Sequence, residues 1–149
     1  MDLNLEWGKP LPLVMEATDL YWADAEKIPN APGIYVFFRE YGDSTEALYV
    51  GQARDLQSRI KQDLDRAKLM NGVKHALNGS RFIAVGELKR RPGQQVKPCL
   101  KIMEHALIRY YLARGDALLN IQGTRIRKHS LTSERKWALN LIPKDLYFE

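Results

Sequence analysis

The sequence predicts an α/β (α+β) fold in which a small antiparallel three-stranded sheet is flanked by helices. Two runs of β-branched and aromatic residues stand on either side of a turn signal, a pattern typical of a β-hairpin. A third strand-like run occupies residues 81–88. Two longer segments repeat apolar residues every three to four positions, which indicates amphipathic helices that would cover the sheet.

Length and composition indicate a single domain spanning residues 1–149. A chain of 149 residues can bury one sizeable core, and it shows no internal repeat or clear linker. No apolar run approaches the ~20 residues of a membrane span, and the N-terminus lacks a signal-peptide pattern. The lone Cys99 excludes a disulfide framework and a multi-cysteine zinc site. We therefore expect a reduced, cytoplasmic protein without a membrane partner.

The first 30 residues carry the weakest structural signals. Thr18 or Asp19 is suited to cap a short helix through Ala25, which would end before Pro29. Chain-breaking residues then occupy positions 30–33. The three predicted strands all follow this segment.

The predicted hairpin comes next. Ile34–Phe38 predicts its first strand and Ala47–Val50 its second, joined by a turn around Tyr41–Ser44. Because side chains alternate along a strand, Tyr35 and Tyr49 would share one side of the hairpin if the aliphatic residues face the core. We expect that side to be open. Ordinary packing on a sheet would also explain each tyrosine taken singly.

A helix and a loop are predicted after the hairpin. Gly51 would let the backbone turn closely toward a helix that Asp55 caps and that runs to about Lys68. Asn-Gly pairs at positions 71–72 and 78–79 predict a loop that holds at most one helical turn. The third strand follows this loop.

A second long helix is predicted over residues 98–113. Gly115 would end it, because glycine readily adopts the left-handed conformation that closes helices. A last helix would begin at Thr132 or Ser133 and run through about Leu141.

Charge is distributed unevenly along the chain. Residues 1–46 hold three basic and nine acidic residues, whereas residues 47–149 hold twenty basic and nine acidic ones. The second part therefore has a net charge of +11, which suits a nucleic-acid partner. An ordinary solvated basic surface would explain the same charge.

Two charged residues stand out against the apolar pattern of the predicted helices. Arg59 flanks the apolar stripe of its helix, where it could reach a phosphate over the sheet edge or extend into solvent. Glu104 lies on the apolar face of residues 98–113, where a carboxylate costs free energy unless it is paired or binds a cation. A lone carboxylate suits Mg²⁺, although a structural salt bridge would also explain it.

The order and spacing of these residues resemble the core of the GIY-YIG nuclease family. The tripeptides at 33–35 (GIY) and 49–51 (YVG) correspond to the two that name the family. An arginine, a glutamate and an asparagine then follow in the family's order, so the resemblance covers about residues 29–121, with extensions at both ends. The matched site residues are Tyr35, Tyr49, Arg59, Glu104 and Asn120.

The resemblance implies a metal-dependent endonuclease that hydrolyses phosphodiester bonds, with DNA as the favoured partner and RNA not excluded. Tyr35 would act as general base or hydrogen-bonding partner for the attacking water, which Tyr49 would help to position. A tyrosine with a pKa of ~10 is a poor base, so a nearby cation would have to lower that pKa. Arg59 would stabilise transition-state charge, Glu104 would hold one Mg²⁺ or Mn²⁺, and Asn120 would orient neighbouring groups.

Two positions depart from the family pattern. Many members carry a tyrosine or histidine four residues after the arginine, where this chain has Asp63. Many carry a lysine, serine or threonine after the second tripeptide, where this chain has Gln52. These departures leave the route of proton transfer open. The candidate nucleic-acid contacts are Arg54, Lys89, Arg90, Arg91, Arg125, Arg127 and Lys128.

The size of the chain and its single cysteine favour a small standalone member of the family. Two other interpretations stay open. The chain could be a catalytically silent GIY-YIG-like module that binds nucleic acid or a partner, although retention of all five site residues argues against this. It could also be a small basic α/β protein without a nucleic-acid role. The sequence predicts neither the oligomeric state nor the recognition site.

Overall fold

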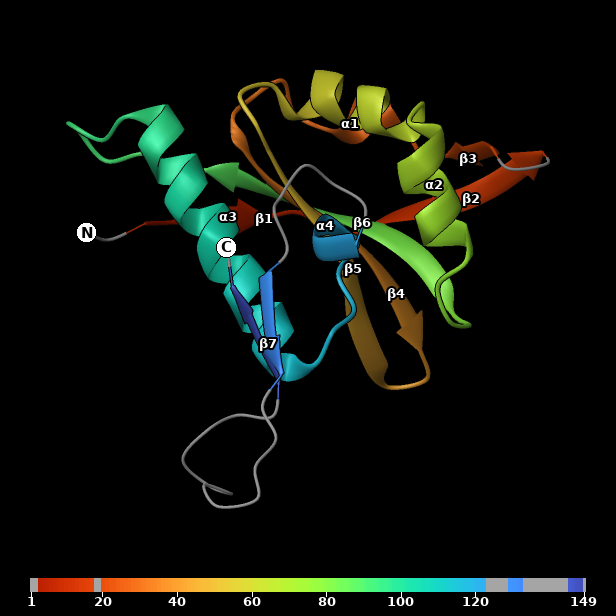
Figure 1. The fold of residues 1–149 in the computed structure, drawn as a ribbon. Coiled ribbons are helices and arrows are strands. Elements are labelled where there is room, and N and C mark those ends of the chain that lie inside the picture. Colours follow the sequence, from red (N-terminus) through yellow and green to blue (C-terminus); the bar gives the residue numbers. More distant parts are fainter. Residues whose placement is uncertain (1–2, 18–19, 123–128, 133–144, 149) are drawn as a thin grey trace, which may run out of the picture.

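An antiparallel sheet of six strands forms the centre of the molecule (Figure 1). The computed structural model describes residues 3–17, 20–122, 129–132 and 145–148. In chain order the elements are β1 (Leu5–Trp7), β2 (Leu11–Ala17), β3 (Leu20–Trp22), the 3-10 helix η1 (Ala25–Lys27), β4 (Gly33–Tyr41), β5 (Ser44–Ala53), α1 (Leu56–Leu64), α2 (Ala67–Lys74), β6 (Ser80–Leu88), α3 (Val96–Arg114), α4 (Leu119–Gln122), β7 (His129–Thr132) and β8 (Asp145–Phe148).

The strands lie in the order β3-β2-β6-β4-β5, and β1 pairs with β6 as β2 does. The predicted hairpin is confirmed, because β4 and β5 pair antiparallel from Gly33↔Ala53 to Tyr41↔Ser44. β6 occupies the other side of β4, so β4 is central and β5 is an edge strand. Within the described ranges, no further strand pairs with the outer side of β5.

The predicted count of three strands is wrong, because β1, β2 and β3 extend the sheet. Leu13 is buried between exposed neighbours, as in a strand with one covered face. The short helix predicted before Ala25 is also wrong, since Leu20–Trp22 pairs with β2 and a single 3-10 turn follows. Capping signals involve only a few residues, whereas this segment forms a strand because it pairs with β2, which in turn pairs with the distant β6.

The helix after the hairpin ends earlier than predicted. Asp55 caps α1 as expected, and its carboxylate accepts the backbone N–H of Ser58 at 3.3 Å. α1 stops at Leu64, and the helix α2 takes the place of the predicted loop. Gly72 lies within α2, where a Cβ would come within 2.9 Å of the Leu119 side chain. The absence of a side chain thus allows α2 to approach α4 closely.

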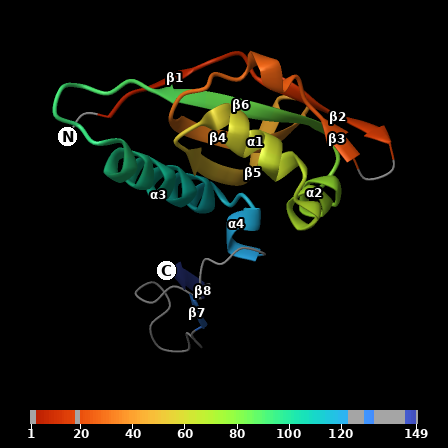
Figure 2. The ribbon, with the colours of Figure 1, turned by 90° about the horizontal axis from the view of Figure 1, so that it is seen from above.

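Helices cover both faces of the sheet (Figures 1 and 2). α1 and α2 pack against the face that carries Tyr35, Phe37 and Tyr49, whereas α3 packs against the face that carries Ile34. The tyrosine side of the hairpin is therefore buried, contrary to the prediction that it is open. A bulge in the pairing of β4 with β5 also places Leu48 in the tyrosine cluster rather than opposite to it.

The structure confirms the second long helix as α3. It ends at Gly115, whose φ of 92° lies in the left-handed region that glycine tolerates best. β7 and β8 form a separate two-stranded sheet, and Thr132 ends β7. The last predicted helix, from Ser133 to Leu141, falls outside the described residues. None of the helices in the described ranges is both long and apolar enough to span a membrane.

Candidate functional site

A cavity of about 720 Å³ lies at the outer edge of β5. Residues 49–53 of β5 form one wall, and α1, α3 and α4 supply side chains from segments far apart in the sequence. Figure 2 shows α3 and α4 next to each other on this side of the sheet. The cavity is therefore a product of the tertiary fold.

Four of the five predicted site residues line this cavity. They come from four different elements: Tyr49 from β5, Arg59 from α1, Glu104 from α3 and Asn120 from α4. Arg54, a predicted nucleic-acid contact, lies on the same wall and is exposed. These predicted residues, which are far apart in the sequence, thus lie together at one cavity in the fold.

Tyr35, the fifth predicted residue, lies beneath the cavity rather than on its wall. Its side chain is fully buried, with 0% of its surface exposed. A Cβ built on Gly51 would come within 2.2 Å of the Tyr35 ring, so only glycine lets the two strands pack in this way. Gly51 itself lines the cavity. Its role is to admit the tyrosine ring, not to turn the backbone toward α1 as the sequence predicts.

A buried hydrogen bond joins Tyr35 to Asp63 of α1. The Tyr35 hydroxyl donates to Asp63 Oδ2. The other carboxylate oxygen lies 3.2 Å from Nη1 of Arg66 and 3.7 Å from Nε of Arg59. Asp63 is fully buried, whereas both arginine side chains are nearly half exposed. This network connects the buried tyrosine to Arg59 on the cavity wall.

The surroundings of Tyr35 stabilise its neutral form. Burial raises the pKa of the hydroxyl well above its usual value of 10, and the charge of Asp63 and the hydrogen bond to it add to the rise. Arg59 opposes this shift but is outweighed. Among the groups of the chain itself, the cation expected to lower the pKa of Tyr35 is therefore present but too weak to offset burial.

Asn120 closes the open edge of β5. Its Oδ1 accepts the Val50 N–H at 2.8 Å, and its Nδ2 donates to the Val50 carbonyl at 2.7 Å. The side-chain amide thus takes the place of a neighbouring strand at this residue. Asn120 is 3% exposed, and its two hydrogen bonds tie α4 to the backbone of β5.

The next outward-facing backbone group on β5 belongs to Gln52. Bonding partners alternate along an antiparallel pair, and Val50 already directs its N–H and C=O outward to Asn120. Gln52, two residues later and paired with Ile34, must therefore also direct its backbone N–H outward at the cavity. The sequence analysis missed this donor, because a sequence does not reveal which strand lies at an edge.

Positive charge dominates the cavity wall. Arg54, Arg59 and Lys97 line it, and Glu104 is the one carboxylate among its described lining residues. The sequence analysis began this helix at residue 98 and missed Lys97 as a site residue, whereas the structure puts Lys97 in the first turn of α3.

The donor set of the cavity fits one kind of metal ion. No group of three or more His, Cys, Asp or Glu side chains suited to a metal occurs in the described part of the chain. One carboxylate, Glu104, fits an ion such as Mg²⁺ or Mn²⁺ that keeps most of its waters and binds substrate oxygens. It does not fit a metal held only by protein ligands.

Among the described residues, the other predicted nucleic-acid contacts do not line this cavity, and they differ in exposure and in partners. Lys89 Nζ lies 3.0 Å from a Glu87 carboxylate oxygen and 3.6 Å from one of Glu6, so other side chains already partner it. Arg90 and Arg91 are exposed in the loop before α3. Three predicted contacts lie outside the described residues: Arg125, Arg127 and Lys128.

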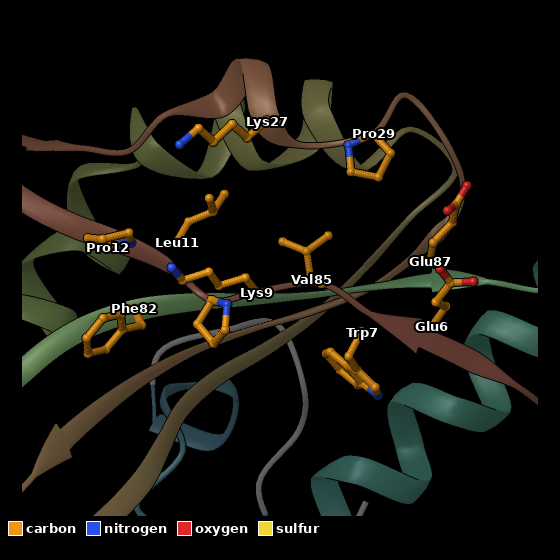
Figure 3. A pocket seen from close by; sticks show the side chains of 12 residues that line it. Glu6, Trp7, Lys9, Leu11, Pro12, Lys27, Pro29, Phe82, Val85 and Glu87 are labelled. Carbon is orange, nitrogen blue, oxygen red and sulfur yellow. The ribbon is translucent and has the colours of Figure 1, made fainter.

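A second cavity, of about 570 Å³, lies among β1, β2, β6 and η1 (Figure 3). Figure 3 shows Leu11 and Val85 facing Lys27 and Pro29 across this space. None of the five predicted site residues lines it. The predicted residues thus distinguish the cavity at β5 from this one.

Parts of three longer proteins are similar to this chain. UvrABC system protein C of Agrobacterium fabrum (strain C58) is 40% identical over 60 residues, which are 40% of this chain and 8% of that protein. UvrABC system protein C of Rhizobium meliloti (strain 1021) is 38% identical over 56 residues, 36% of this chain and 8% of that protein. A Mycobacterium tuberculosis protein provisionally named a bifunctional exonuclease/endonuclease is 43% identical over 63 residues, 40% of this chain and 9% of that protein.

The similarity is confined to a small part of each relative, since less than a tenth of its length is covered. No family model matches the chain, and no solved structure matches it. The GIY-YIG resemblance therefore stays a prediction. Over about two fifths of its length, the chain is similar to segments of UvrABC system protein C and of a protein named for nuclease activity.

Proposed function

We propose that this chain is a divalent-metal-dependent endonuclease that hydrolyses phosphodiester bonds in DNA. The observation that carries the proposal is the meeting of Arg59, Lys97 and Glu104 at one cavity on the β5 edge. A cationic wall with one carboxylate suits a phosphodiester accompanied by a metal ion. The partial similarity to a protein named as an exonuclease/endonuclease supports the same reaction.

The cavity binds the scissile phosphate through cations and a backbone donor. Arg59 directs its Nε toward Asp63 and also hydrogen-bonds with Tyr35, and the exposed part of its guanidinium is available to a phosphate. Lys97 approaches from α3, and the Gln52 N–H approaches from the strand edge. These donors also stabilise the negative charge that develops on the phosphate oxygens in the transition state.

Hydrolysis joins the oxygen of a water molecule to phosphorus, with loss of a proton to solvent, and breaks the bond from phosphorus to one sugar oxygen, which solvent protonates. Glu104 would hold the metal ion. When bound, that ion supplies Lewis acidity at the phosphate and supports the departing oxygen. Tyr49 lines the cavity and helps to orient the water. Tyr35 is buried and neutral, so it supports the site from below instead of acting as a strong base.

Digestion of a supercoiled plasmid tests the proposal. The purified chain should nick or linearise the plasmid with Mg²⁺ or Mn²⁺ and stop when a chelator is added. End sequencing of the products reports any site preference. A labelled RNA of the same sequence, digested in parallel, distinguishes the two nucleic acids, because phosphate contacts alone do not.

A silent nucleic-acid-binding module is the second candidate. The full burial of Tyr35 favours it, since the residue that the resemblance casts as a base does not reach the cavity. Salt-dependent DNA binding without cleavage of any DNA or RNA, with either metal, would establish the silent module. Absence of both binding and cleavage would overturn both candidates.

A further inference from the structure

An acid lies on the apolar face of α1. Leu56, Ile60 and Asp63 follow one another at helical spacing, and all three have 0% exposure. A buried carboxylate costs free energy unless hydrogen bonds and opposite charges compensate it. The partners of Asp63 therefore indicate why it is there.

Three side chains from three parts of the fold converge on the Asp63 carboxylate. Tyr35 of β4 donates its hydroxyl hydrogen to Oδ2. Arg59, one turn earlier in α1, and Arg66, at the start of α2, approach Oδ1 at 3.7 and 3.2 Å. Both oxygens are occupied, so Asp63 fixes the direction in which each partner points.

Each arginine connects Asp63 to the cavity wall. Arg59 lines the cavity itself. The Arg66 guanidinium lies 6.0 Å from the centre of the Tyr49 ring, and a hydrogen bond with Tyr49 raises the pKa of Arg66. Tyr49 also lines the cavity. The buried Asp63 carboxylate thus contacts Arg59, which lines the cavity, and Arg66, which contacts the lining residue Tyr49. Asp63 itself does not line the cavity.

We propose that Asp63 is a positioning residue of this cavity: it holds Tyr35, Arg59 and Arg66 in the arrangement that phosphate binding requires. The inference rests on the proposed function. Asp63 accepts the one hydroxyl hydrogen of Tyr35 and forms an ion pair with the Nε of Arg59. The Tyr35 oxygen is then left only as an acceptor, and Arg59 hydrogen-bonds with Tyr35, so the three side chains hold one another in place.

The competing explanation is that Asp63 only stabilises the fold. The variant Asp63→Asn separates the two, because it keeps an acceptor of the same shape and removes the charge. Asp65→Asn is the matched control, since Asp65 lies two residues away and is exposed. In steady-state DNA cleavage we expect Asp63→Asn to lower kcat/KM about 10- to 100-fold, as displaced catalytic groups do, and Asp65→Asn to leave it unchanged.

Two further measurements distinguish a positioning role of Asp63 from a role in fold stability alone. Asp63→Glu, which restores the charge, should recover part of the lost kcat/KM. In the double variant Tyr35→Phe with Asp63→Asn, the loss in transition-state stabilisation should be smaller than the sum of the losses in the two single variants. Both single changes break the same hydrogen bond, so the second change has less left to remove. Full additivity, or no recovery with glutamate, would overturn the inference.

A titration independent of catalysis keeps this inference separate from the proposed function. The near-ultraviolet absorbance of ionised tyrosine, compared with that of Tyr35→Phe, reports Tyr35 directly. Asp63→Asn should let Tyr35 ionise at a lower pH than in the unmodified chain, because a negative neighbour is gone. Affinity for a short DNA duplex without metal should also fall.

The outcomes are distinguishable. If the unmodified chain cuts no substrate, the proposed function fails, while the titration and the duplex affinity still decide the role of Asp63. If the unmodified chain cuts DNA and a folded Asp63→Asn variant cuts it equally well, the inference fails and the function stands. If Asp63→Asn does not fold, Tyr35→Phe, which breaks the same hydrogen bond, replaces it, and unchanged cleavage and affinity in that variant overturn the inference.

Discussion

The two cavities of this molecule differ in how their charges are arranged. The cavity at β5 measures about 720 Å³ and the one among β1, β2 and β6 about 570 Å³, so size does not separate them. Among its described lining residues, the second cavity has two acids, Glu6 and Glu87, and two bases, Lys9 and Lys27. The charges of these lining side chains therefore cancel.

At the β5 cavity the acid that partners Arg59 is not on the wall. Asp63 lies buried behind it, which leaves three cations and Glu104 facing the space. A buried carboxylate can therefore orient a cationic side chain that lines a cavity without itself competing with the ligand for that cation. The arrangement of charge, and not the volume, distinguishes a candidate active site from an ordinary surface cavity.

The largest expected contrast comes from the carboxylates of the two cavities. Glu104→Gln should reduce metal-dependent plasmid cleavage by at least about 100-fold, since the group that holds the ion is lost. The matched change Glu87→Gln, in the second cavity, should leave the initial rate of nicking unchanged. Equal rates for Glu104→Gln and the unmodified chain would remove Glu104 from the site.

The cations offer the next contrast. Arg59→Gln should lower the cleavage rate about 100-fold, the usual effect of losing a donor to transition-state charge. Lys27→Gln, at the second cavity, should have no effect on cleavage under the same ionic strength. A similar loss from both changes would indicate a general electrostatic effect rather than a site at β5.

Two glycines, Gly51 at the β5 cavity and Gly86 next to Trp7 of the second cavity, should differ in what a substitution costs in stability. Gly51→Ala places a Cβ within 2.2 Å of the buried Tyr35 ring and should destabilise the fold by about 1–3 kcal/mol. Gly86→Ala places one at 3.0 Å from Trp7, whose side chain is 43% exposed and can move. We expect a cost below about 1 kcal/mol there. Thermal unfolding of both variants, side by side, measures the contrast, and equal costs would contradict it.

The smallest effect concerns alkaline pH. The pKa of Tyr35 is raised in the folded state, so its contribution to stability is complete below the unfolded-state pKa of ~10 and falls as pH rises through the folded value. The melting temperature should therefore drop less steeply above pH 10 in Tyr35→Phe than in the unmodified chain. Tyr41→Phe is the control, because Tyr41 is 64% exposed. Parallel curves for all three proteins would show that Tyr35 is not perturbed.

Local signals predicted much of the fold correctly. The β4–β5 hairpin, the Asp55 cap of α1 and the Gly115 end of α3 depend on residues close together in sequence, and the structure contains all three. The strands β1 and β2 pair with β6, which is far along the chain, and β3 joins the sheet only through β2. No local pattern carries that information, and so the sheet was predicted too small.

The sequence already contained a clue to Asp63. Its spacing from Leu56 and Ile60 puts a carboxylate on an apolar helical face, the same oddity that singled out Glu104. The helix was instead predicted to continue to about Lys68, well past Asp63, whereas α1 ends at Leu64. The early end of α1 and the start of α2 are tertiary effects, and they obscured this signal.

Sequence order alone determined which residue types occur and in what succession: two tyrosines on a hairpin, an arginine one helix later, and a glutamate on an apolar helical face. Only the tertiary structure decided what those residues do to one another. It buried Tyr35 against Asp63, set Asn120 on the backbone of Val50, and left β5 as an edge. The burial of a side chain and the edge position of a strand arise from contacts between distant segments. The pKa of a buried group depends on the same contacts, so none of the three can be predicted from spacing along the chain.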